Sequence, residues 1–381
     1  MQFKEILGHK EIKSHLINSV QNNRVSHAQL FLGPSGSGSL ALAIAYAQYI
    51  NCEHKSVEDS CGECASCRKY QRLIHPDLHF SYPFFAKGKE ETAKDYMDIW
   101  RTTVLQNPYV TLPHWRDQLD AGNKQANINI AEAHDIIKKL SLKSFEAEYK
   151  VLIMWLPEYL DTQGNALLKL IEEPPEKTLF LLVAENQDKI INTIISRTQL
   201  VKINKVSHQE LKDYLIQEKQ VPAAKAHDIS SIADGNIHDA LALSIHQDEN
   251  TNFTTFVEWM RYIVTDRGAE FINLCEDRLA KMGREHQKSF LLYAIHMLRQ
   301  IILLQQGLRQ IVYIQEEELK FVERFSELYS HEQLSAAIQL FEKMHYGIER
   351  NGNPKILFLD LSLQLVLIFK YQTFPQGTQY I

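Results

Sequence analysis

Four of the five cysteines in this 381-residue sequence lie close together, in the segment NCEHKSVEDSCGECASCRKY. Cys52, Cys61, Cys64 and Cys67 follow the spacing C-x8-C-x2-C-x2-C. Thiolates so spaced are typical ligands of a tetrahedral zinc ion, because an x2 gap lets one turn present two sulfurs to the same metal. Four free thiols and an iron–sulfur cluster are the alternatives, although RKYQRL after Cys67 lacks the final Cys and Pro of a ferredoxin-type run. The spacing favours a structural zinc ion.

A glycine-rich turn in FLGPSGSGSLALAIAYAQYI has the outline of a phosphate-binding loop. Gly33 and Gly38 occupy the two glycine positions of the pattern G-x-x-x-x-G-K-[ST], with Gly36 between them. Ser39 stands where the pattern has the lysine that reaches phosphate, and Leu40 where it has the hydroxyl residue that binds magnesium. The segment therefore predicts the strand, turn and helix of a P-loop that lacks the lysine for phosphate and the hydroxyl residue for magnesium.

The elements around this loop follow from the spacing of apolar residues. HAQLFL, VLIMWL and TLFLLVAEN are short, almost continuous apolar runs, which predict buried strands. Helical patterns lie between them, including NALLKLIEE, which ends at Pro174 and Pro175. Alternating strands and helices predict a parallel α/β sheet that is covered on both faces.

The pattern becomes purely helical after about residue 205. Ser207 and Glu210 form a capping box at the start of the first of these helices. A polar stretch, HQDENTN at residues 246–252, predicts a linker between a small helical unit and a larger one. Residues 83–127, with two tryptophans and three prolines, predict a loop-rich insertion.

The overall composition is that of a soluble globular protein, with 45% hydrophobic and 23% charged residues. The net charge of −6 does not favour a strongly basic nucleic-acid-binding protein. The first residues, MQFKEILGHK, lack the apolar segment of a signal peptide. The most apolar stretch, at 356–369, is shorter than the roughly 20 residues that span a bilayer, so a buried helix is expected there. We expect a cytoplasmic protein.

Several motifs, taken in order, resemble one family closely. HAQLFLGPSGSG, the four-cysteine segment, NALLKLIEEPP, ISRTQ, ADGNIHDAL and ERNGNPKILFLDLSLQLV are similar to the AAA+ subunits of the bacterial DNA polymerase III clamp loader. Within these subunits the pattern is most similar to the delta prime class, which lacks ATPase activity. The similarity covers nearly the whole sequence except residues 83–127.

The resemblance implies three domains. Residues 1–205 would form an α/β AAA+ domain with a degenerate P-loop, a zinc module at 52–67 and the insertion at about 83–127. Residues 206–248 would form a small helical lid domain. Residues 249–381 would form an all-helical collar that holds the subunits of the complex together.

Compared with active members of the family, this sequence has lost the residues that bind nucleotide. Met154 and Trp155 occupy the Asp-Glu positions of the Walker B strand, and neither side chain coordinates a hard cation. His238 in GNIHDAL stands at the position of the sensor-2 arginine. Together with Ser39 and Leu40, these changes imply a subunit that neither binds nor hydrolyses ATP.

One charged element of the family pattern remains. Ser196 and Arg197 in IISRTQ match its arginine-finger motif, in which the arginine acts on the nucleotide of a neighbouring subunit. A guanidinium suits this role because it stays charged and offers a planar fork of donors. The alternative is that Arg197 caps a helix or pairs with a nearby carboxylate.

The resemblance implies a non-catalytic subunit that helps to load the sliding clamp onto primed DNA. Its partners would be the delta and gamma/tau subunits in a hetero-pentamer, the sliding clamp and, through the complex, primer–template DNA, with no membrane partner. The first alternative is an ATP-hydrolysing or ATP-binding motor subunit similar to gamma/tau. The second alternative is a subunit that binds nucleotide through the backbone amides near Gly36 but does not hydrolyse it. A zinc-dependent DNA-binding protein is the third, which the acidic net charge disfavours.

Overall fold

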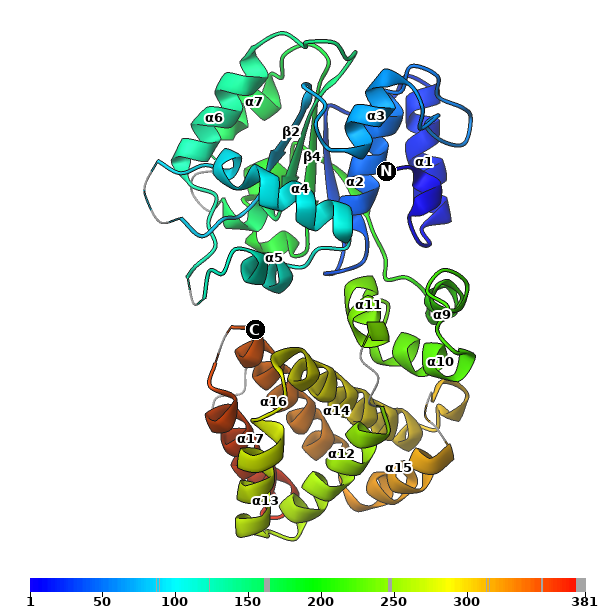
Figure 1. Cartoon of the computed structure of the whole chain (residues 1–381), viewed down its shortest axis with the longest axis vertical. Coiled ribbons are helices and arrows are strands. Elements are labelled where there is room, and N and C mark those ends of the chain that lie inside the picture. Colours follow the sequence, from blue (N-terminus) through cyan, green and yellow to red (C-terminus); the bar gives the residue numbers. More distant parts are fainter. Residues whose placement is uncertain are drawn as a thin grey trace. The chain divides into compact units, whose positions relative to one another are not determined.

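The computed structural model describes residues 1–374 except 87, 89, 123, 161–164, 246–248, 313, 315 and 351 (Figure 1). The chain divides into two compact units, which are described separately below. The first comprises Met1–Leu211 and Gly235–Asp239, and the second comprises Lys212–Asp234 and Ala240–Ile381.

The first unit is built on a five-stranded sheet in the order β2-β3-β4-β1-β5, in which every pair is parallel. Its strands are β1 (Ala28–Leu32), β2 (Leu78–Ser81), β3 (Lys150–Trp155), β4 (Thr178–Ala184) and β5 (Gln199–Lys202). The central strands β3 and β4 are buried along their whole length, as their continuous apolar runs predict. The predicted parallel α/β sheet is confirmed.

Helices cover both faces of this sheet (Figure 1). They are α1 (Lys10–Gln21), α2 (Ser39–Ile50), α3 (Ala65–Gln71), α4 (Met97–Gln106), α5 (Leu112–Gln118), α6 (Ile130–Ser141), α7 (Asn165–Glu172) and α8 (Asn192–Ile195). Every residue of α2 is buried, because α2 contacts strands of the sheet as well as α1 and α3. This explains why α2 is apolar on all sides. On the opposite face, α6 and α7 pack their apolar residues against β1, β3 and β4.

The segment at 83–127 is more ordered than the predicted loop-rich insertion. It contains α4 and α5, and its two tryptophans, Trp100 and Trp115, are fully buried. The ring of Tyr82 stacks on Trp100 at 4.1 Å between centroids, and the indole Nε1 of Trp115 donates to the carbonyl of Pro83 at 2.7 Å. These aromatic rings supply an apolar cluster, so the prolines mark the turns between helices rather than an absence of structure.

The second unit, like the end of the first, is helical throughout its described residues. The helices after the sheet are α9 (His208–Gln217), α10 (Ala223–Ile232), α11 (Ile237–Ile245), α12 (Glu249–Val264), α13 (Gly268–Leu274), α14 (Arg284–Gln305), α15 (Glu316–Leu328), α16 (His331–Glu349) and α17 (Pro354–Phe369). The capping box of Ser207 and Glu210 forms before α9. Residues 246–248 of the predicted linker lie outside the described residues. For residues 249–252 the linker prediction is wrong, because α12 begins at Glu249 and makes them helical.

Helices α12 to α17 share one hydrophobic core. Trp259 lies within it, fully buried, and its Nε1 donates to the hydroxyl of Ser362 at 2.9 Å. Cys275 is also fully buried and contacts the same hydroxyl at 3.3 Å, as expected for an isolated cysteine at an apolar position. In the part of the chain that the structure describes, no helix combines the length and apolar character needed to cross a membrane. The predicted lid and collar domains remain predictions.

Candidate functional site

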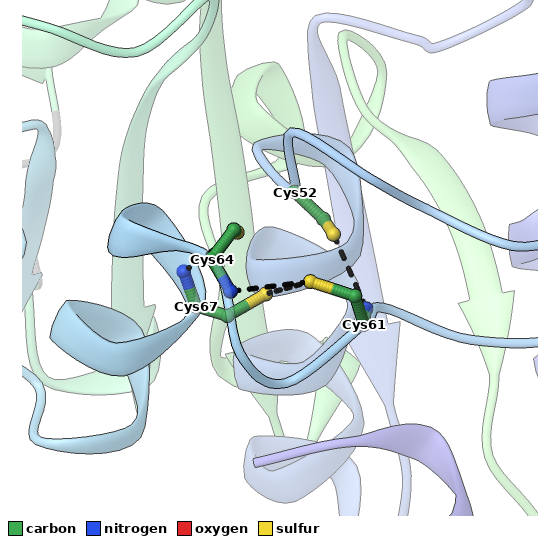
Figure 2. A group of neighbouring side chains, drawn as sticks. All are labelled: Cys52, Cys61, Cys64 and Cys67. Atoms are coloured by element: carbon green, nitrogen blue, oxygen red, sulfur yellow. Dashed lines mark hydrogen bonds between the residues drawn. The ribbon is translucent and has the colours of Figure 1, made fainter.

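The four clustered cysteines come together at one point, between the end of α2 and the start of α3 (Figure 2). Their sulfur atoms all lie within 4.8 Å of one another, and those of Cys61 and Cys67 are 3.9 Å apart. A tetrahedral zinc ion with Zn–S bonds of about 2.3 Å places its sulfurs roughly 3.8 Å apart. The four residues therefore have the spacing that a zinc ion requires.

Backbone N–H groups point at three of these sulfurs, as Figure 2 shows in part. The amides of Cys61, Cys64 and Cys67 donate to the sulfurs of Cys52, Cys61 and Cys64 at 3.2, 3.3 and 3.3 Å. Burial acts to raise the pKa of Cys61, but the N–H donors of Cys64 and Glu63 lower it to about 6. Burial raises the pKa of Cys52 and of Cys67. Amide donors stabilise thiolates, the form that binds metal.

The cysteine module is held against the N-terminal segment by Asp59. Its carboxylate oxygens accept from the N–H groups of Phe3 and Lys4 at 3.1 and 2.9 Å. The side chain of Gln48, on α2, also donates to the hydroxyl of Ser60 at 2.9 Å. The module is thus part of the first unit's framework, which fits a structural rather than a catalytic metal.

The glycine-rich turn follows β1 and leads into α2, as the sequence predicts. Gly36 and Gly38 have φ values of +68° and +99°, a left-handed conformation that glycine adopts readily. Ser39 is the first residue of α2, and its hydroxyl lies 3.1 Å from that of Ser37. Leu40 is buried. The turn therefore joins β1 to α2 through two glycines in the left-handed conformation, the hydroxyl of Ser39 faces a serine, and Leu40 lies in the core.

Little space remains above this loop. Pro108, Tyr109 and Val110, from the segment between α4 and α5, line it together with Trp155. The remaining cavity has a volume of about 20 Å³, enough for one water molecule, whereas ligand pockets usually measure about 300–1,000 Å³. Sequence reasoning missed this cover. The letters NPYV have no periodic pattern, and only the fold shows that they reach back across the loop.

Met154 and Trp155, which the resemblance places at the Walker B positions, are the last two residues of β3. Met154 and Trp155 are 1% and 2% exposed, and Met154 belongs to the core between the sheet and α6 and α7. The ring of Trp155 lies 5.2 Å from that of Trp100 in the aromatic cluster of the 83–127 segment. Both positions are thus occupied by packing residues that have no ligand atom for magnesium.

His238, at the expected sensor-2 position, contacts the 83–127 segment. Its Nδ1 lies 3.2 Å from the side-chain nitrogen of Asn107, and its ring centroid is 5.0 Å from that of His114. The preceding residue, Ile237, donates its N–H to the carbonyl of Gly36 at 3.0 Å. The structure therefore places His238 near the glycine-rich loop, with a neutral amide and a histidine as its neighbours.

Arg197 follows α8 and forms an ion pair with Glu172, the last residue of α7. Its Nη1 also donates to the carbonyl of Thr193 at 2.8 Å and to the hydroxyl of Ser196 at 3.3 Å. The side chains of Arg197 and Glu172 are 34% and 42% exposed. In the single chain, Arg197 thus has the local carboxylate partner that the alternative interpretation required, while part of its surface stays open to solvent.

Comparison with known proteins places these features in a family. The family described as "DNA polymerase III, delta subunit" matches residues 8–207. The chain is 29% identical over 248 residues to DNA polymerase III subunit tau of Bacillus subtilis, a match that covers 64% of this chain and 37% of that protein. It is 24% identical over 358 residues to DNA polymerase III subunit delta′ of the same organism, covering 91% of this chain and 94% of that protein.

Among solved structures, the DNA clamp loader delta protein of Bacillus subtilis matches 92% of this chain and 98% of its own. The two are 14% identical, and their TM-score is 0.32.

Proposed function

We propose, from the premise that this chain belongs to the DNA polymerase III delta-subunit family, that it is the non-catalytic, delta prime-type subunit of a bacterial clamp loader. In this role it would sit in a hetero-pentamer with delta and gamma/tau subunits and help to place the sliding clamp on primer–template DNA. The match to a delta′ relative over more than nine-tenths of both chains supports this assignment over gamma/tau.

The small volume of the cavity above the glycine-rich loop is the observation that carries the proposal. Ser39 and Leu40 supply neither a cation for phosphate nor a hydroxyl for magnesium, and about 20 Å³ of free space remains beside them. Met154 adds no carboxylate at the Walker B position. A subunit of this kind keeps the shape of an ATPase domain, and hence its place in a ring, without turnover of its own.

The charged residue that this subunit contributes is Arg197. When a neighbouring subunit hydrolyses ATP, negative charge grows on the transferred phosphoryl group, and an arginine supplied in trans stabilises it. The ion pair with Glu172 lies at the surface, and such pairs contribute about 0–1 kcal/mol. Redirecting Arg197 from Glu172 to a neighbour's phosphate therefore costs little free energy.

The second unit offers a surface for assembly on α17. Ile356, Leu363 and Leu367 lie within one stripe of this helix and are 64%, 51% and 41% exposed, although the opposite side of α17 is buried in the core. Asp360 and Gln364, which are joined by a hydrogen bond, lie beside this stripe. Exposed apolar residues that are bordered by polar ones are typical of a contact with another protein. We therefore assign residues 249–381 as the collar domain, with this stripe packed against a neighbouring subunit and residues 206–248 as the lid.

Zinc is the metal that the cysteine cluster suits. Cys52, Cys61, Cys64 and Cys67 would hold it, and a filled Cys₄ shell leaves no open position for catalysis. The ion would fix the loop between α2 and α3, which has too few apolar residues to pack by itself.

The alternative is a motor subunit of the gamma/tau type, because the tau relative is 29% identical over a match that covers 64% of this chain. Such a subunit requires ATP turnover. The test is a steady-state ATPase measurement on the full-length chain alone, with zinc bound. We expect no turnover above a chain-free control, and turnover that depends on magnesium would contradict the non-catalytic assignment.

A further inference from the structure

The residues that close the cavity above the glycine-rich loop come from the 83–127 segment, which the proposed function does not explain. We call residues 107–110, which lie between α4 and α5, the cover residues. We infer that the cover residues act as an internal ligand of the loop, taking the place of a nucleotide and holding residues 235–239 against it. This inference rests on the proposed lack of nucleotide binding and adds the structural element responsible.

Tyr109 makes the first connection, between the cover residues and the loop. A methyl group added at Gly38 would lie 3.3 Å from the Cε1 atom of Tyr109, so the ring lies close over the loop and leaves little room for a side chain at Gly38. The tyrosine is buried, and its hydroxyl oxygen accepts from the N–H of Leu7 at 3.1 Å. One side chain therefore joins the N-terminal segment to the turn where phosphate would bind.

Asn107 makes the second connection, from the cover residues to His238. Its side-chain oxygen accepts from the N–H of Tyr109 at 3.0 Å, which fixes the turn that carries the tyrosine. Its side-chain nitrogen lies 3.2 Å from Nδ1 of His238. One short turn thus contacts both the loop and the position where the family has a nucleotide-binding arginine.

The third connection runs directly between residues 235–239 and the loop. Ile237 donates its N–H to the carbonyl of Gly36 at 3.0 Å. The side chain of Asn236 lies so close that a methyl group added at Gly36 would be 1.9 Å from its oxygen. Asn236 is itself held by Asp239, whose carboxylate accepts from its amide at 2.6 Å. Loop, cover residues and residues 235–239 form one continuous packed cluster.

A bound nucleotide connects a P-loop to groups that lie across it, through bonds that form and break during turnover. In this chain a tyrosine ring, an asparagine amide and one backbone hydrogen bond make the same connection permanently. Residues 235–239 should therefore stay ordered on the loop at all nucleotide concentrations, and the 83–127 segment has the task of keeping them there.

Hydrogen exchange of the full-length, zinc-loaded chain tests this inference, with the amide of Ile237 as the probe. We expect Tyr109→Ala to speed its exchange about tenfold or more, and Asn107→Ala to do so by a smaller factor. Tyr109→Phe, which removes only the acceptor for Leu7, should have the smallest effect. Leu105→Ala, an exposed residue of the same segment, is the matched control and should leave exchange unchanged. Unchanged protection in both alanine variants, with β1 and β4 still protected, overturns the inference.

A second experiment distinguishes two reasons for the lack of nucleotide binding: the space filled by the cover residues, and the missing phosphate-binding and magnesium-binding side chains at Ser39 and Leu40. Ser39→Lys with Leu40→Thr rebuilds the phosphate-binding pattern, and we expect no binding of ATP at about 1 mM because Tyr109 still fills the site. Adding Tyr109→Gly should then give measurable binding. Equal binding by the double and triple variants overturns the inference alone. Binding of ATP by the unaltered chain overturns the nucleotide-free part of the proposed function as well.

Discussion

Arg197 and Glu172 form an ion pair that joins the end of α8 to the end of α7 on the surface of the first unit. The pair holds the guanidinium in place, with further hydrogen bonds to the carbonyl of Thr193 and the hydroxyl of Ser196. Two roles are therefore possible for one arginine. A structural role would depend on Glu172, whereas a role on a neighbour's nucleotide would not.

The proposed zinc site predicts that loss of the metal is accompanied by loss of stability. Cys64→Ser should reduce the bound zinc from about one ion per chain to a small fraction of that, because three thiolates remain in a site built for four. Because metal binding free energy is folding free energy, the first unit should also unfold at lower temperature. Metal analysis and calorimetry measure both effects. Cys275→Ala is the control, since Cys275 lies in the other unit, and zinc loss in this variant would contradict the assignment.

The aromatic cluster of the 83–127 segment predicts a large loss of stability for Trp100→Ala. Trp100 is fully buried and contacts the rings of Tyr82, Trp115 and Trp155. Removing such a side chain costs about 3–5 kcal/mol of the free energy of unfolding. Urea denaturation monitored on the first unit gives the value. Leu105→Ala, at an exposed site of α4, should change it by less than about 0.5 kcal/mol, and similar values for the two would argue against a packed segment.

His79, on β2, predicts a dependence of stability on pH. Burial, with the nearby positive charges of Lys139 and Lys150, lowers its pKa from 6.5 to about 4. The folded chain therefore binds fewer protons than the unfolded chain between these values, so stability is lost as the pH falls from 6.5 toward 4. His79→Gln does not titrate and should flatten the curve of unfolding free energy in this window. Identical curves for the two proteins would show that His79 does not titrate as described.

The stripe on α17 predicts a defect in assembly without a defect in folding. Leu363→Glu should weaken association with the other clamp-loader subunits by about tenfold or more, because a carboxylate would be buried at the contact. Since Leu363 is exposed in the single chain, the melting temperature of the isolated chain should hardly change. Leu328→Glu, at a 62% exposed site on α15, is the matched control. Analytical ultracentrifugation of the mixture measures assembly, and equal association of both variants would contradict the assignment of the surface.

Much of the fold was predictable because its signals are local. The runs VLIMWL and TLFLLVA are almost entirely apolar because β3 and β4 are buried on both faces, and the x2 gaps keep Cys61, Cys64 and Cys67 close together at the start of α3. Strand β2 was missed because its alternation of apolar and polar residues, LHFS, extends over only four residues, the shortest run that indicates a strand. The compact packing of residues 83–127 was not predicted. It depends on contacts of Trp100 and Trp115 with Tyr82, which the periodicity of the sequence does not reveal.

The candidate site, like the fold, has features that local sequence predicts and features that depend on tertiary packing. The sequence itself predicts that Ser39 and Met154 stand where the family pattern has a lysine and an acidic residue, because a motif fixes the position of each. The cover of Tyr109 over the loop and the pairing of Arg197 with Glu172 were not, because they join residues far apart in the chain through tertiary packing. Only the structure shows that Tyr109 lies over the glycine-rich loop.

The most direct test is the steady-state ATPase rate of the reconstituted loader with clamp and primed DNA, compared for the unaltered subunit, Arg197→Ala and Glu172→Gln. If Arg197 acts on a neighbour's nucleotide, Arg197→Ala should lower the rate at that site by about 10³-fold or more, while assembly is unchanged. Glu172→Gln, which removes only the local ion pair, should stay within about threefold of the unaltered complex. An equal effect of the two variants, or none from Arg197→Ala, would reduce Arg197 to a structural residue.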